Sequence, residues 1–333
     1  MLNNRKNQFD LMDGNNILQY QDRVLAGEKL TEFQLSELIN SSDLKTLSSA
    51  ANKITRKFQG SKVDVEQLAN IKKNYCSEDC VFCGQSAFFN TSKEGYQLLP
   101  AEEIIKTAKK AKEEGAESYC LVAAWRQPSD SDFLKVCEII TKIRENVGIS
   151  LECSLGFLTD VQAKKLKELG VKRYNHNLET ARSKFSQICT THTYQDRLDT
   201  LYIARSAGLE LCTGGIIGMG ETREQRLELI SELSRLEPEE VTINLLVAIP
   251  GTPLELQTPI SFEEILRVFA VTRFALPKSI IKISGGREVH LEDSGEELLL
   301  SGANGIISSG YLTLSGNPMN KDLEMIKNIK LEA

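Results

Sequence analysis

Short β-rich runs alternate with amphipathic helical stretches from about residue 60 to the end of the chain. The runs with strand character lie at 66–71, 118–123, 149–154, 171–177, 209–215, 240–246, 280–285 and 304–308. The stretches between them carry apolar residues at helical spacing, and the one at 100–116 has proline in its first turn and glycine near its end. A helix after each strand, eight times over, predicts the α/β class and a (β/α)8 TIM-type barrel.

The segment before the first of these strands lacks the alternation. It contains two helical patterns, at 31–42 and 43–60, and no proline- or glycine-rich linker separates them from the rest. We therefore expect residues 1–60 to form an N-terminal helical extension that caps the barrel. Residues 61–333 would form the barrel and a C-terminal tail.

Composition narrows the functional class. Hydrophobic residues make up 41% of the chain and charged residues 26%, a balance that allows a real core in a soluble protein. The net charge of −6 and the absence of a lysine–arginine block argue against nucleic-acid binding. No run approaches the ~18 apolar residues of a membrane span, and the first twenty residues lack the apolar core of a signal peptide. We expect a cytoplasmic protein, whose eight cysteines stay reduced and serve as ligands, nucleophiles or core residues.

Three of the cysteines are clustered directly after the first strand. Cys76, Cys80 and Cys83 have the spacing C-x3-C-x2-C in a polar loop. Structural zinc normally takes four ligands, and a ferredoxin-type iron–sulfur cluster also needs a fourth cysteine. The spacing therefore favours a four-iron cluster whose fourth iron is open to a small molecule.

This cysteine motif, with the aromatic Phe82 before its last cysteine, resembles the signature of the radical S-adenosylmethionine superfamily. The resemblance implies a [4Fe–4S] cluster held by Cys76, Cys80 and Cys83. In that superfamily the open iron chelates S-adenosylmethionine, and an electron from the cluster cleaves the cofactor to a 5′-deoxyadenosyl radical. Barrel walls that exclude water would protect such a radical.

Several further residues have chemistry that a barrel interior could use. Cys120, Cys153 and Cys212 lie in three different predicted strands, either as small core residues or converging in the lumen. Buried amides and guanidinium groups need partners, which a polar ligand in the lumen would supply. The residues of this kind on or after the predicted strands are Asn175, Asn177, Asn244 and Arg287.

Seven short stretches in order narrow the resemblance to the biotin synthase family. They are CSEDCVFCGQS, YCLVAAWR, YNHNLET, TYQDRLDTL, LCTGGIIGMGET, NLLVAIPGTPL and SGGRE followed by GANGI, between about residues 60 and 320. The resemblance implies an enzyme, a sulfurtransferase that inserts sulfur into dethiobiotin to form biotin in two radical steps. It also implies a second, sacrificial iron–sulfur cluster, of the [2Fe–2S] type, as the sulfur donor.

The same resemblance assigns roles residue by residue. It gives the second cluster to Cys120, Cys153, Cys212 and Arg287. It gives the ureido ring of dethiobiotin to Asn177 and Asn244, with Asn175 on the same face as Asn177. Glu179 would bind the cofactor ribose, Arg197 its carboxylate, and the glycines Gly214 and Gly215 would let backbone approach its methionine portion.

Three departures from the family pattern carry expectations of their own. Ser77 and Gly84 replace the usual prolines of the cysteine loop, and Leu314 and Ser315 stand where threonines would meet the substrate carboxylate. Cys189 replaces an apolar residue and is either a core cysteine or a fourth thiolate beside the second cluster. In the latter case that cluster would be a four-iron type.

Two alternatives remain open at this point. One is another radical S-adenosylmethionine barrel, of the hydrogenase-maturation or methylornithine-forming type. The other is a non-enzymatic iron–sulfur module. For the leading hypothesis the expected partners are dethiobiotin, S-adenosylmethionine, a reductant such as flavodoxin or ferredoxin, and the iron–sulfur assembly machinery. No nucleic acid or membrane is expected, and the resemblance implies a homodimer.

Overall fold

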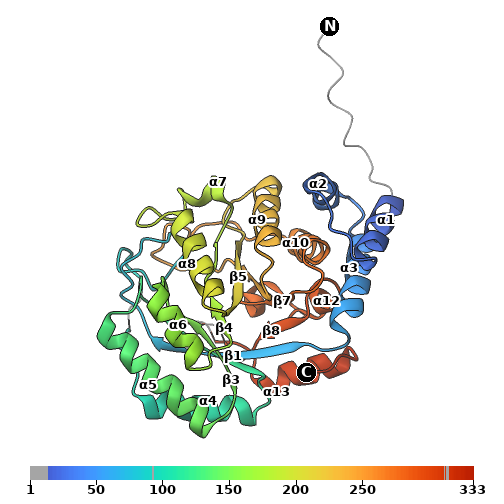
Figure 1. Ribbon diagram of the computed structural model, residues 1–333. Helices are drawn as coiled ribbons and strands as arrows, with labels where there is room; N and C mark the ends of the chain where they lie inside the picture. The colour runs from blue at the N-terminus through green and yellow to red at the C-terminus, as the bar shows by residue number, and fades with distance from the viewer. Residues whose placement is uncertain (1–13, 92–93, 311, 313–314) are drawn as a thin grey trace.

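The computed structural model describes residues 14–91, 94–310, 312 and 315–333. Eight parallel strands in this part of the chain close into a barrel, in which β8 returns to pair with β1. The strands are β1 (Asp64–Lys72), β2 (Ser118–Ala123), β3 (Ser150–Ser154), β4 (Arg173–Asn175), β5 (Glu210–Ile217), β6 (Glu240–Leu245), β7 (Ile280–Ile283) and β8 (Gly305–Ile307). All eight overlap the runs expected from the sequence, so the predicted (β/α)8 barrel is confirmed (Figure 1).

Helices surround the strands as an outer layer (Figure 1). Those after the strands are α4 (Ala101–Glu113), α5 (Asp130–Asn146), α6 (Asp160–Glu168), α7 (Arg182–Phe185), α8 (Tyr194–Ser206), α9 (Arg223–Leu236), α10 (Phe262–Ala275), α11 (Arg287–His290), α12 (Glu296–Leu299) and α13 (Met319–Asn328). Thr159, Thr193 and Thr222 each begin a helix by accepting a hydrogen bond from the backbone N–H three residues on. Such caps satisfy backbone donors that a helix start leaves free, and they fix where each helix begins.

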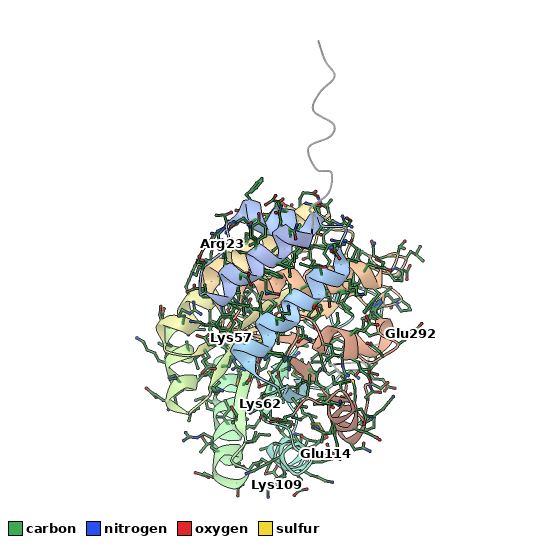
Figure 2. The ribbon with its side chains drawn as sticks, turned by 90° about the vertical axis from the view of Figure 1, so that its right-hand side faces the viewer. Arg23, Lys57, Lys62, Lys109, Glu114 and Glu292 are labelled. Atoms are coloured by element: carbon green, nitrogen blue, oxygen red, sulfur yellow. The ribbon has the colours of Figure 1, made fainter. Side chains whose placement is uncertain are left out.

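The N-terminal segment contains three described helices rather than the two expected. They are α1 (Gly14–Leu25), α2 (Glu32–Asn40) and α3 (Leu44–Gln59). α3 packs against α10 and α1, while α2 contacts α9 and α10. Figure 2 looks onto this side of the molecule, where Arg23 and Lys57 project from α1 and α3 at the surface. These helices therefore extend the helical layer over one side of the barrel.

No helix among the described residues is both long and apolar enough to cross a membrane. The barrel interior is also unusual in composition. Side chains alternate between the lumen and the helices along each strand, and several lumen positions near the starts of the strands are charged and fully buried. The loops after the strands surround the cavities described next, at the end of the barrel where TIM-barrel sites lie.

Candidate active site

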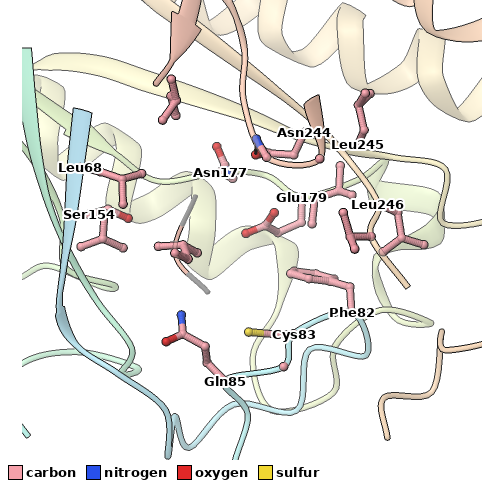
Figure 3. A pocket seen from close by; sticks show the side chains of 18 of the residues that line it. Leu68, Phe82, Cys83, Gln85, Ser154, Asn177, Glu179, Asn244, Leu245 and Leu246 are labelled. Atoms are coloured by element: carbon pink, nitrogen blue, oxygen red, sulfur yellow. Dashed lines mark hydrogen bonds between the residues drawn. The ribbon is translucent and has the colours of Figure 1, made fainter. Parts of the chain in front are cut away.

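Two adjoining cavities open at the carboxyl ends of the strands. The larger, about 250 Å³ in volume, extends from the cysteine loop down to Glu66 and Cys120 in the lumen. Figure 3 shows Cys83, Asn177 and Glu179 among the residues that line it. The second, about 170 Å³, lies between the cysteine loop and the ends of β2 to β4. Their shared lining includes Cys83, Asn177 and Glu179, so the predicted cofactor and substrate residues face one connected space.

The cysteine loop folds back on itself after β1. The Cys76 backbone N–H donates to Gln85 O at 2.9 Å, and Cys83 N–H donates to Cys80 O at 2.9 Å. Beneath the loop, Asn70 Nδ2 donates to Gln85 Oε1 at 3.0 Å, which ties it to the strand. All three cysteines line the second cavity. The structure thus brings together the three thiols that the motif singled out.

The surroundings of these thiols favour their protonated form. Burial raises the pKa of Cys76 and raises that of Cys83 to about 11. A hydrogen bond with Cys189, followed by burial, raises the pKa of Cys80 well above its usual value. Iron binding must therefore displace protons from the thiols. Three sulfur atoms on one cavity wall, with open space beside them, fit a cluster that keeps one iron accessible.

Cys189 lies beside this loop and not in the lumen, which argues against the second of its two alternatives, a fourth thiolate at the second cluster. Its Sγ is within 4.8 Å of Cys80 Sγ and of a ring nitrogen of His192. It also lies 3.1 Å from Asp79 Oδ1. The hydrogen bond with Cys80 lowers the pKa of Cys189 to about 4. The physical reason is topological: the segment between β4 and α8 folds over the cysteine loop, which the linear sequence does not reveal.

Glu179 and Arg197 meet at the edge of the same space. Glu179 follows β4 with a positive φ of 68° and forms a β-bridge with Gly215. Arg197 Nη1 lies 3.3 Å from Glu179 Oε1 and donates to Asn177 O at 2.8 Å. Arg197 Nε donates to His192 Nε2 at 3.0 Å. Burial raises the pKa of Glu179. His192, which the motifs of the sequence did not single out, therefore helps to orient the arginine.

The three asparagines line the cavities, but their amides are satisfied differently. Asn177 Oδ1 accepts from Thr242 Oγ1 at 2.9 Å. Asn244 Oδ1 accepts from Gly285 N–H at 2.9 Å, and its Nδ2 donates to Gly215 O at 3.3 Å. Backbone groups thus supply hydrogen-bond partners for the Asn244 amide, contrary to the expectation that a ligand in the lumen would supply them.

Gly214 and Gly215 are explained by the packing of protein backbone. A Cβ on Gly214 would lie 1.9 Å from Thr242 O, and one on Gly215 would lie 2.6 Å from Glu179 O. Only glycine permits these approaches. Leu314, expected near the substrate carboxylate, lies outside the described residues, and Ser315 is exposed.

The lumen beneath the cavity holds thiols and charges. Cys120 and Cys212 are fully buried there, and Cys212 Sγ donates to Glu240 Oε1 at 3.1 Å. Burial, reinforced by the negative charge of Glu66, raises the pKa of Cys120. Burial also raises the pKa of Glu66 to about 7 and that of Glu152 well above its usual value.

Cys153 does not belong to this set, which corrects its assignment to the second cluster. Glu152 and Ser154 occupy the lumen positions of β3, so Cys153 between them faces the helices. Burial raises its pKa, with smaller contributions from Glu152 and from Cys137 on α5, and Cys137 and Cys153 both belong to the hydrophobic core. Cys153 is thus a core cysteine, the alternative that was open for any one of these residues.

Arg287 is also absent from the lumen, contrary to its assignment as a cluster ligand. It follows Gly286, whose φ of 84° turns the chain into α11. Its guanidinium donates to both carboxylate oxygens of Asp322 on α13, at 2.9 and 2.7 Å. The lumen cation of β7 is instead Lys282, which sequence reasoning missed. A lysine between isoleucines in a buried strand was the available signal.

Comparisons with known proteins agree with this geometry. The model of the Radical SAM superfamily matches residues 70–233, and that of the Biotin and Thiamin Synthesis associated domain matches residues 242–332. A biotin synthase of Nitrosopumilus maritimus is 68% identical over 95% of this chain and 98% of its own length. Those of Cenarchaeum symbiosum and Clostridium tetani are 60% and 41% identical, each over 95% of this chain and 99% and 98% of their own lengths.

Solved structures support the fold. Methylornithine synthase superposes with a TM-score of 0.83 over 94% of this chain and 96% of its own, at 22% identity. The hydrogenase maturase HydG superposes with a TM-score of 0.84 over 96% of this chain and 76% of its own, at 17% identity. At such identities the similarity to these structures shows the barrel fold alone. The family is shown by the biotin synthases with 41–68% identity. The chain belongs to the biotin synthase family of the radical S-adenosylmethionine superfamily.

Proposed function

We propose that this chain converts dethiobiotin to biotin by radical insertion of sulfur, with Cys76, Cys80 and Cys83 as the ligands of a [4Fe–4S] cluster. The observation that carries the proposal is the meeting of these three thiols with Glu179 and Arg197 around one cavity. When bound, the cluster and S-adenosylmethionine supply the 5′-deoxyadenosyl radical that removes hydrogen atoms from the substrate.

The residues around the cofactor position have complementary charge. Arg197 is buried, and among the described residues its Nη2 donates no hydrogen bond, which leaves a cationic donor for the carboxylate of S-adenosylmethionine. Glu179 offers acceptor oxygens for ribose hydroxyls. Because Arg197 is fixed by His192 and by Asn177 O, it is oriented before the cofactor arrives.

The larger cavity suits a compact, mostly apolar substrate with one polar ring. Its wall includes Leu68, Val122 and Leu246, which exclude water from the position where a radical would form. Asn177 Nδ2 has no hydrogen-bond partner among the described residues, so it can donate to the oxygen of a cyclic urea. Asn175 and Asn244 add amide groups to the same lining.

The proposal includes further partners that follow from the family. They are a second iron–sulfur centre as the sulfur source, a one-electron reductant of the flavodoxin or ferredoxin type, and the iron–sulfur assembly machinery. The family also leads us to propose a cytoplasmic homodimer.

An anaerobic assay tests the proposed activity. The full chain is reconstituted with iron and sulfide, then reduced with S-adenosylmethionine and dethiobiotin present. We expect 5′-deoxyadenosine at about twice the amount of biotin, because each of the two carbon–sulfur bonds needs one hydrogen abstraction. Cys80→Ala should form neither product. Deoxyadenosine without biotin or a thiolated intermediate would contradict the proposed substrate.

A further inference from the structure

A layer of three glutamates fills the lumen below the substrate cavity. Glu66, Glu152 and Glu240 come from β1, β3 and β6, and their carboxylate oxygens lie within 4.8 Å of one another. Each side chain is at most 2% exposed. Interior layers of such barrels are normally packed with branched apolar residues. Three carboxylates at this depth are therefore costly unless something compensates their charge.

Two buried cations compensate the layer in part. Lys282 Nζ lies 2.5 Å from Glu66 and 2.8 Å from Glu240. Arg173 Nη1 lies 2.7 Å from Glu152 and 2.6 Å from Glu240. Three carboxylates thus face two cations. At the rim, Asp64 pairs with Lys282 and Glu210 pairs with Arg173. With every carboxylate ionised the layer would therefore carry an excess of negative charge, which bound protons or a metal cation would balance.

The second observation is a set of polar atoms in the same layer that lack partners. Cys120 is 1% exposed, lines the cavity floor with Glu66, and makes no hydrogen bond among the described residues. Two positions earlier, on the same face of β2, the Ser118 hydroxyl is buried and also unpaired. Glu152 Oε2 is buried without a partner as well. Since buried polar atoms are nearly always paired, these atoms indicate a missing ligand.

We propose that this layer is a metal site of mixed oxygen and sulfur ligands, and that it takes iron. Thiolates alone would favour copper(I), zinc or a sulfide cluster, and carboxylates alone would favour magnesium or manganese. Iron accepts both kinds of donor. The donors, contributed by five strands, are Cys120, Cys212, Glu66, Glu152 and Glu240. We call this set the floor site.

The floor site deepens the proposed function, on which it rests for its biological purpose, by naming the protein donors of the second metal centre. The cavity extends from Cys83 at its top to Glu66 and Cys120 at its base. A substrate in the cavity would therefore lie between the two metal positions. This donor set differs from the three thiols and an arginine that the family resemblance implied, because β3 presents Glu152 to the lumen and β7 presents Lys282.

Iron binding by a variant without the cysteine loop ligands tests the floor site. The full chain carrying C76A, C80A and C83A is titrated anaerobically with ferrous iron, with and without sulfide, and bound iron is counted after desalting. We expect iron to remain bound, and X-ray absorption to detect oxygen as well as sulfur neighbours. Adding C120A or E152Q should weaken binding by at least about tenfold, the lower end of the losses caused by removing supporting residues around metals.

Cys153→Ala is the matched control, because it removes a thiol one residue from Glu152 but on the opposite face of β3. It should leave iron binding unchanged. No iron in the triple variant, or equal losses in E152Q and C153A, would overturn the proposal and leave the layer as a closed salt-bridge network.

Two further readouts keep the test independent of folding and of activity. If E152Q does not fold, the absorption spectrum of the triple variant decides alone, and sulfur-only neighbours would overturn the proposal. Biotin formation is measured separately in the wild-type chain. Iron at the floor site with no biotin formed would contradict the proposed function and leave the metal site standing.

Discussion

Replacing Arg287 with methionine distinguishes a structural guanidinium from a ligand inside the barrel. The side chain is fully buried, and its two terminal nitrogens donate to both oxygens of Asp322. Asp322 lies on α13, so the pair fastens the C-terminal helix to the loop after β7. Methionine keeps much of the apolar stem of arginine and removes every donor.

The expected loss of stability follows from leaving Asp322 buried without its cation. Breaking one partner of a buried ion pair costs about 3–5 kcal/mol. Asp322 Oδ2 would still accept from Ser308 Oγ at 2.7 Å, so we expect the lower end, about 3 kcal/mol. At about 2–4 °C per kcal/mol for large domains, this lowers Tm by about 6–12 °C. Circular dichroism melts and urea denaturation measure both quantities.

Two further variants sharpen this test. Adding Asp322→Leu to Arg287→Met should recover most of the loss, because the unpaired buried charge is then gone. Arg235→Met is the surface control. Its own side chain is 60% exposed and pairs with Glu232 and Glu32 at the surface, so we expect a change below about 1 kcal/mol. An Arg287→Met protein with wild-type stability and lost iron would refute the structural role.

Three other predictions follow from single contacts. Burial lowers the pKa of His176, so below pH 6.5 the unfolded chain binds a proton that the folded chain does not. As the pH falls, the free energy of unfolding from urea denaturation should decrease by about 1.4 kcal/mol per pH unit more in the wild type than in His176→Gln. Equal pH slopes would contradict this. Gly214→Ala should reduce soluble folded protein severely, since its Cβ would overlap Thr242 O; a wild-type melt would disprove the clash. Cys189→Ala should change the electron paramagnetic resonance spectrum of the first cluster and leave iron at the floor site unchanged. Loss of iron at the floor site with an unchanged spectrum of the first cluster would instead support Cys189 as a ligand of the second cluster.

Much of the fold could be read from the sequence because its determinants are local. β-rich runs and helical spacing each act within a few residues, and they placed all eight strands. α1 was missed although its buried residues Ile17, Gln21 and Val24 recur at helical spacing, because the central one is polar and interrupts the apolar pattern. Its helical state depends on packing against α3, which a local pattern does not contain.

The candidate site also combines residues whose positions depend on local sequence with residues whose positions depend on long-range folding. The cysteine motif is one short loop, so its three thiols could be expected to converge. The place of Cys189 was left open and Arg287 was misplaced, because both positions depend on long-range folding. Cys189 lies on a segment that crosses the cysteine loop, and Arg287 follows a glycine turn toward α13. Residue type fixes neither the crossing of that segment nor the direction of the glycine turn. The contact of His192 with Arg197 depends on the same crossing.

The wrong expectation that Cys153 faces the lumen has a different origin. The sequence of β3 contained the needed information, but the wrong one of two alternating sets of side chains was assigned to the lumen. In the stretch LECS, both Glu152 and Cys153 could face the lumen, and a thiol suited the expected cluster. Because side chains alternate along a strand, the direction of one side chain fixes that of its neighbours. Ser154 lines the cavity, so Glu152 lies on the same face of β3 and Cys153 lies on the other. The charges nearby agree, since Arg173 Nη1 contacts both Glu152 and Glu240. A shift of one residue along β3 therefore places the carboxylate of Glu152, and not the thiol of Cys153, at the floor of the barrel. That replacement, and not the number of cysteines in the chain, determines which metal chemistry the lumen can support.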